Sequence, residues 1–377
     1  RDLVRSRGLG DVYKRQMCFC VEIPLGKNQK TMITVLKDVA DYMFSSALDK
    51  ITILTDQPEV QFKLLYGDTE ILNETYVPDA EGKITILDLQ DLIEPYLASK
   101  LIGGFFYVIV VAGKTDTVRG FTVQYCAAES SLDAKEFMRT HFLTAMIGGE
   151  KVTAIGRKEF LHLVVLESTA VKVSCDYLAP DGTLVAKEFS LDTIASNSEV
   201  ATIDVSPDQF ISEIGMLLRY TVVAGDRSQY FQIDLSCPDA APCLLFTNSF
   251  GCQETFYCTG THALEPEYDR SSAMIDGMFR HYHIEENRVF KANTGILNTP
   301  MSLWADDLFR SKEIYLLEGE RPGKEIAITD SESTRTNDYD NLPAYTFSYR
   351  YAQRNQNILQ LSRAGRVFDN TFDNTFG

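Results

Sequence analysis

The tetrapeptide Val-Val-Ala-Gly occurs twice in this chain, at residues 110–113 and again at residues 222–225. Each copy precedes a strand-like run that starts with phenylalanine, Phe-Thr-Val-Gln-Tyr-Cys at 121–126 and Phe-Gln-Ile-Asp-Leu-Ser-Cys at 231–237. The copies lie roughly 110 residues apart, and such self-similarity at a fixed spacing is typical of a repeated structural unit. The sequence therefore predicts that one fold occurs twice in tandem.

The residues before each tetrapeptide repeat in the same order. Apolar residues alternate at 60, 62 and 64 before a Gly-Asp turn at 67–68, and again at 171, 173 and 175 before a Pro-Asp-Gly turn at 180–182. Alternation that ends in a turn is typical of β-hairpins. Short helical crossings are expected at 90–97 and 206–211. We predict two tandem immunoglobulin-like β-sandwich domains, at residues 17–130 and 131–238, and the second begins with a connector helix within 131–145.

The chain after residue 238 does not repeat this pattern. The Pro-Asp-Ala-Ala-Pro segment at 238–242 is suited to a domain boundary. Strands are expected at 244–247, 255–258, 313–317, 325–329 and 344–352, with a helix at 302–310. The fold class expected overall is mainly β, with a β-rich (α+β) C-terminal domain at 239–377.

The first sixteen residues resemble the translation of a sequencing adapter rather than a protein segment. Ser6 to Gln16 read Ser-Arg-Gly-Leu-Gly-Asp-Val-Tyr-Lys-Arg-Gln, which is one reading frame of such an adapter. We expect residues 1–16 to be a disordered, adapter-derived artefact and leave them out of the fold. The alternative is a basic targeting arm.

Composition bears on the class of partner. The chain has 377 residues, 36 Lys+Arg and 53 Asp+Glu, and a formal charge of −17. A surface of that sign repels phosphate backbones, so no nucleic-acid partner is expected. The longest apolar run, at 105–112, has the length of a strand, so no membrane insertion is expected either.

The eight cysteines lack the spacing of a zinc site and are too sparse for a disulfide scaffold. Small buried thiols in a chain that folds in a reducing cytoplasm account for most of them. Cys252 and Cys258 flank a short hairpin-like segment, and we consider that they pair under oxidising conditions.

Few residues suggest catalysis or metal binding. His281 and His283 form the one histidine cluster, and on a strand they would share a face with Glu285, which makes them weak metal candidates. A solvated strand face is the simpler interpretation. Motifs for nucleophilic hydrolysis, zinc proteases and nucleotide binding are absent from the sequence, so we expect no enzyme activity, no catalytic residues and no cofactor.

Aromatic residues indicate binding more than chemistry. Six lie in expected loops, where they would serve sugar stacking or protein interfaces: Phe250, Phe256, Tyr257, Tyr268, Tyr282 and Tyr339. Phe-Asp-Asn-Thr occurs twice in succession at 368–375, which suggests a terminal strand. That strand would dock on its own domain or, by β-addition, on a neighbouring subunit of a homo-oligomer.

Several segments resemble tail and other virion structural proteins of tailed phages and prophages. They are the Leu-Leu-Phe-Thr-Asn-Ser-Phe-Gly run at 244–251, the Ser-Lys-Glu-Ile-Tyr-Leu run at 311–316, the strands at 326–330 and 344–352, and the segment at 72–96. The resemblance implies a baseplate or fibre-associated component of a virion, folded in the host cytoplasm, whose partners are other virion proteins. The alternative is a bacterial cell-surface adhesin or carbohydrate-binding protein with a glycan receptor.

Overall fold

The computed structural model describes residues 33–130, 132–196, 199–319, 321–334 and 342–353. The described chain is mainly β, with three short α-helices and several sheets. It divides between Ala134 and Lys135 into two compact units. The expected artefact at 1–16 and the expected terminal strand at 368–377 lie outside the described residues.

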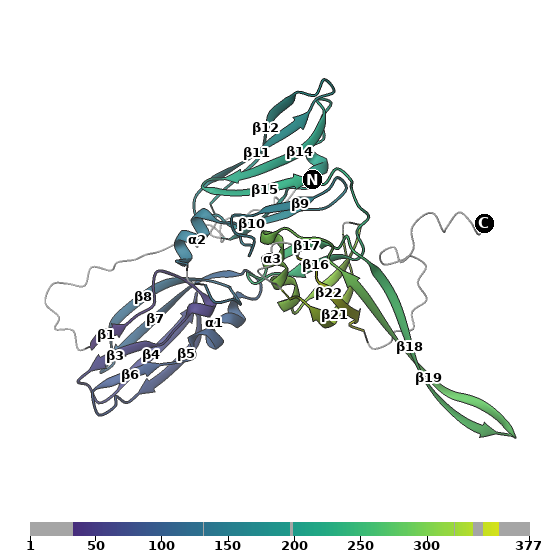
Figure 1. The fold of residues 1–377 in the computed structure, drawn as a ribbon. Coiled ribbons are helices and arrows are strands. Elements are labelled where there is room, and N and C mark those ends of the chain that lie inside the picture. The colour runs from purple at the N-terminus through teal and green to yellow at the C-terminus, as the bar shows by residue number, and fades with distance from the viewer. Residues whose placement is uncertain (1–32, 131, 197–198, 320, 335–341, 354–377) are drawn as a thin grey trace, which may run out of the picture. The chain divides into compact units, whose positions relative to one another are not determined.

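The first unit contains two sheets that share one core (Figure 1). A five-stranded sheet has the order β5-β4-β7-β8-β2, and a three-stranded sheet has the order β1-β3-β6. The strands are β1 (Ile33–Lys37), β2 (Tyr42–Phe44), β3 (Ile51–Thr55), β4 (Val60–Tyr66), β5 (Thr69–Tyr76), β6 (Lys83–Ile86), β7 (Ile102–Val111) and β8 (Lys114–Gln124).

Alternation along the strands builds this core. Val60, Phe62 and Leu64 of β4 are all buried, and the residues between them are partly exposed, as the period of two predicts. Helix α1 (Leu89–Leu97) lies between β6 and β7 and buries Ile93 in the same core. The alternation at 60–64 is therefore a buried strand face.

Helix α2 (Ala134–Thr140) lies at the division between the units, and the second unit then repeats the order of the five-stranded sheet. Its five-stranded sheet runs β12-β11-β14-β15-β9, and β10 pairs with β13. The bounds are β9 (Glu150–Thr153), β10 (Phe160–Val164), β11 (Thr169–Leu178), β12 (Leu184–Ile194), β13 (Val200–Asp204), the 3₁₀ turn η3 (Pro207–Phe210), β14 (Met216–Ala224) and β15 (Arg227–Ile233).

The two five-stranded sheets agree strand by strand. In each, three antiparallel pairs are followed by one parallel pair, β2 with β8 in the first sheet and β9 with β15 in the second. The two Val-Val-Ala-Gly segments end corresponding strands, β7 and β14, and run into the turns before β8 and β15. The repeat in the sequence thus coincides with a repeat in sheet topology.

The rest of the second unit is a seven-stranded sheet with the order β17-β16-β20-β21-β22-β19-β18. Its strands are β16 (Cys243–Thr247), β17 (Gln253–Tyr257), β18 (His262–Ile275), β19 (Met278–Asn293), β20 (Ile314–Glu318), β21 (Arg321–Glu332) and β22 (Thr346–Tyr351). Helix α3 (Thr299–Arg310) packs on this sheet. The expected boundary at residue 238 therefore lies inside the second compact unit.

Helix α3 begins and packs for identifiable reasons. The side chain of Asn298 accepts a hydrogen bond from the Met301 amide at 2.9 Å, which caps the first turn. Pro300 lies in that first turn, where the backbone N–H that proline lacks would have no partner within the helix. Trp304 and Leu308, one turn apart, are buried against the sheet, and the Trp304 ring stacks on Phe256 at 5.0 Å. The only tryptophan of the chain is thus a core residue.

Candidate functional site

Strands β18 and β19 form a long hairpin whose base belongs to the seven-stranded sheet (Figure 1). β19 pairs with β22 through Phe290–Asn293, and the hairpin extends beyond that pairing. The two-residue turn is Asp276-Gly277, with φ of 52° and 74°. Positive φ at both positions is what a type I′ hairpin turn requires, and Asp-Gly is one of the sequences that favour it.

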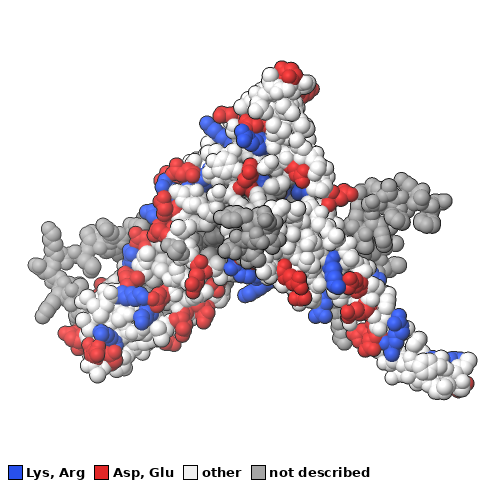
Figure 2. Space-filling view, in the orientation of Figure 1, with Lys and Arg blue, Asp and Glu red and all other residues white. Residues whose placement is uncertain are grey.

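The end of this hairpin carries exposed apolar side chains. Met274 and Phe279, which lie opposite each other in the register, are 69% and 70% exposed. Ile275 and Met278, the next pair, flank the turn and are also exposed. Figure 2 shows this end as mostly uncharged surface. We call Met274, Ile275, Met278 and Phe279 the hairpin tip. Contiguous exposed apolar surface of this kind is typical of interaction sites.

Nearer its base the hairpin is charged on both strands. Glu265 of β18 pairs with Lys291 of β19 at 2.8 Å, and Arg288 pairs with Glu286 at 2.8 Å. The Arg270 guanidinium lies 4.7 Å from the centre of the Tyr268 ring. These ion pairs make the base of the shaft polar. Ile284 and Tyr282 are exposed farther along it, so the exposed apolar surface is concentrated at the tip but not restricted to it.

A bulge separates the two histidines that the sequence singles out. His283 lies opposite Ser271 and His281 opposite Ser272, because Tyr282 is the extra residue of the register shift. Ser271 and Ser272 are consecutive and point to opposite faces, so the two imidazoles do not share a face. His281 instead contacts the Ser272 hydroxyl, Nδ1 to Oγ, at 2.6 Å. The premise of a two-histidine metal site is therefore wrong.

Metal-ligating side chains are also dispersed elsewhere in the described chain. Among the described residues, no group of three or more His, Cys, Asp or Glu side chains is arranged to hold a metal ion. The described cysteines are free thiols. Cys252 and Cys258 lie at opposite ends of β17, roughly 20 Å apart along an extended strand, whereas a disulfide needs Cα atoms within about 7 Å. The considered pairing of these two cysteines is therefore wrong.

The aromatic residues expected in loops divide into two groups. Phe250 and Phe256 are buried, and Phe250 stacks on Phe137 at 5.1 Å. Tyr257 is partly buried, and its hydroxyl contacts the Lys158 backbone. Tyr268 and Tyr282 are exposed on the hairpin, and Tyr339 lies outside the described residues. Of the described aromatic residues that were expected in loops, the exposed ones therefore lie on the hairpin.

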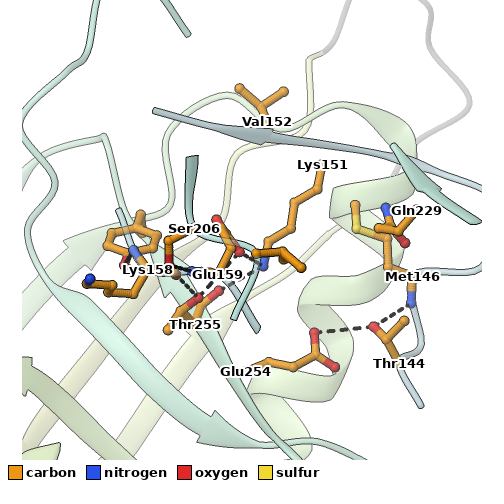
Figure 3. Close-up of polar contacts among 12 residues, drawn as sticks. Thr144, Met146, Lys151, Val152, Lys158, Glu159, Ser206, Gln229, Glu254 and Thr255 are labelled. Atoms are coloured by element: carbon orange, nitrogen blue, oxygen red, sulfur yellow. Dashed lines mark hydrogen bonds and ion pairs between the residues drawn. The ribbon is translucent and has the colours of Figure 1, made fainter. Parts of the chain in front are cut away.

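A second candidate is a buried polar cluster between β9 and β17, drawn in Figure 3. Lys151 of β9 forms an ion pair with Glu159 at 2.6 Å, and both side chains are almost completely buried. The same ammonium donates to the Thr255 carbonyl at 3.2 Å and lies 4.4 Å from the centre of the Trp304 ring. One cation thus contacts both halves of the second unit.

Glu254 of β17 is the other centre of this cluster. One of its carboxylate oxygens accepts hydrogen bonds from Trp304 Nε1 at 2.7 Å and from the Thr144 hydroxyl at 3.2 Å. The other accepts from Asn248 Nδ2. Burial raises the pKa of Glu254, while Lys151 and the hydrogen bonds from Asn248 and Thr144 oppose that shift.

These contacts hold together the two halves of the second unit. His162 of β10 adds a third link, because its Nε2 contacts the Gln253 carbonyl at 2.7 Å. Burial lowers the pKa of His162, which favours its neutral form. The polar contacts named here are all made to protein, although the Glu159 Oε1 atom is buried without a hydrogen-bond partner, and we interpret the cluster as structural. Sequence reasoning missed it because Lys151, Glu159 and Glu254 belong to separate segments without a shared motif.

Comparison with protein-family models finds no family that matches this chain, and comparison with curated proteins finds no relative. Within the described residues, no helix is long and apolar enough to span a membrane.

Proposed function

We propose that this protein is a non-enzymatic structural component of a phage or prophage tail, associated with the baseplate or a fibre, and that it binds its partners through the hairpin tip. The observation that carries the proposal is the long β18–β19 hairpin with its exposed apolar end. A hairpin that exposes four apolar residues to water gains stability when another surface covers them.

We propose further that the repeated topology represents two immunoglobulin-like β-sandwiches that arose by tandem duplication. The identical order of the sheets β5-β4-β7-β8-β2 and β12-β11-β14-β15-β9 supports this origin, together with the repeated Val-Val-Ala-Gly segments. Sandwich domains in series present loops and edges to partners, which suits an assembly role. The segments at 244–251 and 344–352 resemble virion proteins, and this resemblance supports the proposal that the chain assembles in a tail.

Immunoelectron microscopy tests this proposal. Antibodies against the chain are applied to particles that are banded by density from a culture carrying the gene. We expect label on tails, since the chain is proposed to fold in the host cytoplasm and remain in the virion. Label on bacterial surfaces, with none on particles, would contradict the proposal and favour the adhesin alternative.

A further inference from the structure

The second unit has an apolar pocket that is separate from both the hairpin tip and the buried polar cluster. It lies beside the ends of β14 and β15 and has a volume of about 240 Å³. Its lining includes Ile155, Ile211, Met216, Leu235 and Cys237. All five of these side chains are exposed, and Ile211 is 61% exposed.

The hairpin tip has the size to fill this pocket. A cavity of about 150 Å³ lined by aliphatic side chains is known to hold a benzene ring. The pocket is larger than that, so it has room for the Phe279 ring, with the flexible Met274 side chain beside it. Both surfaces are apolar and exposed, and joining them would remove both from water.

The charges around the pocket are acidic, and those at the tip are of both signs. Asp234 lines the pocket, and Glu213 lies in the loop between the lining residues Ile211 and Gly215. Arg280, which follows Phe279, and Asp276, in the turn, are both exposed at the tip. Docking is therefore favoured in the orientation that brings Arg280 toward Asp234 and Glu213 and leaves Asp276 in water.

We propose that the hairpin tip of one molecule docks into this pocket on a second copy of the same chain. The inference rests on the proposed assembly function and names the partner. The tip and the pocket are different surfaces, so the contact is heterologous, and its repetition links copies into a ring or a row. The hairpin reaches roughly 40 Å from its base at about 3.3 Å per residue, which is enough to bridge neighbouring molecules.

Disulfide cross-linking tests the contact, because Cys237 is a native exposed thiol in the pocket. The full chain carries Cys18→Ser and Cys20→Ser, to remove two other thiols, together with Met274→Cys. It is oxidised with copper-phenanthroline and separated on a non-reducing gel. We expect species of two or more chains at least ten-fold above either control, with peptide mapping that joins residue 274 to Cys237.

Two matched controls define the background. Leu184→Cys, in the same background, introduces a thiol on β12 at a residue that is as exposed as Met274, 69% in both cases. The second control adds Cys237→Ser to the Met274→Cys chain. Cross-linking equal to these controls, or a 274–237 link within a single chain, would overturn the proposal.

A non-covalent readout separates this inference from the proposed function. Phe279→Asp and Ile211→Asp are expected to weaken self-association at least ten-fold in sedimentation, because each buries a charge in the contact. If only Phe279→Asp does so, the tip has another partner surface and the pocket is excluded. Cross-linking without any label on tails would overturn the virion role and leave the docking intact.

Discussion

Two opposing effects determine whether the buried Glu254 carboxyl group is charged. Its burial disfavours the charged carboxylate, and its three hydrogen-bond donors favour it. The balance leaves its pKa above the ordinary value of 4.5. Because the folded state holds this proton more tightly than the unfolded state, the contribution of Glu254 to stability is greatest at low pH and declines as pH rises.

Replacing Glu254 with glutamine removes this titration and keeps the shape. We predict that the free energy of unfolding of the native chain, minus that of Glu254→Gln, falls as pH rises above 4.5. The fall is about 1.4 kcal/mol per pH unit until the folded carboxyl ionises. Urea unfolding of both proteins between pH 4 and pH 8 measures it. A difference that grows with pH would contradict the raised pKa.

Lys151 is the partner whose removal leaves a charge buried. Lys151→Met deletes the ammonium and leaves the Glu159 carboxylate without its cation. We predict a loss of about 3–5 kcal/mol in the free energy of unfolding. The double variant Lys151→Met with Glu159→Gln should recover part of that loss, because the Glu159 carboxylate is no longer buried without its cation, whereas Glu254 still lacks the favourable charge of Lys151. Calorimetry of the native chain, the two single variants and the double variant measures these losses. If the Lys151→Met variant and the double variant lose equal stability, the unpaired Glu159 carboxylate is not the cause.

Single residues were predicted well where their pattern is local. The alternation of Val171, Val173 and Cys175 predicted a hairpin strand, and all three residues are buried on β11. The Lys151–Glu159–Glu254 cluster has no such local pattern, because three separate segments bring it together. His281 and His283 were expected on one face since a regular strand has a period of two, and the bulge at Tyr282 breaks that period.

Short strands and helices of the C-terminal region follow from the sequence to within a few residues. The helix expected at 302–310 is α3 (Thr299–Arg310), and the strand expected at 344–352 is β22 (Thr346–Tyr351). The β18–β19 hairpin was not predicted, because both faces of its shaft are solvated and its apolar residues do not alternate. The signal that marks it is Asp276-Gly277 between Met274-Ile275 and Met278-Phe279.

The Asp276-Gly277 turn should control the outer hairpin alone. A Cβ added at Gly277 would meet no atom within 4 Å, so its effect comes from the positive φ of 74°. We predict that Gly277→Ala costs about 1 kcal/mol and speeds amide hydrogen exchange in β18 and β19 roughly five-fold. Exchange in β4 and β11 is the internal control. Unchanged exchange in the hairpin would contradict the turn assignment.

The two compact units differ in whether their β-sheets depend on contacts with other parts of the same unit for stability. The first unit has one core built from its own strands and α1. Within the second unit, buried contacts of Lys151 and His162 reach the seven-stranded sheet. We predict that residues 17–134 alone unfold cooperatively near the temperature of the first unit in the full chain, whereas residues 135–238 alone lose stability. Calorimetry of the two fragments measures this, and a stable 135–238 fragment would contradict it.

The central claim is that this chain assembles with other copies through the hairpin tip. The most direct test is the molar mass of the full chain, measured by light scattering over a hundred-fold range of concentration, beside that of Phe279→Asp. We predict that the native chain exceeds the mass of one molecule as concentration rises and that the variant remains monomeric. If both proteins remain monomeric, or both assemble equally, the account is contradicted.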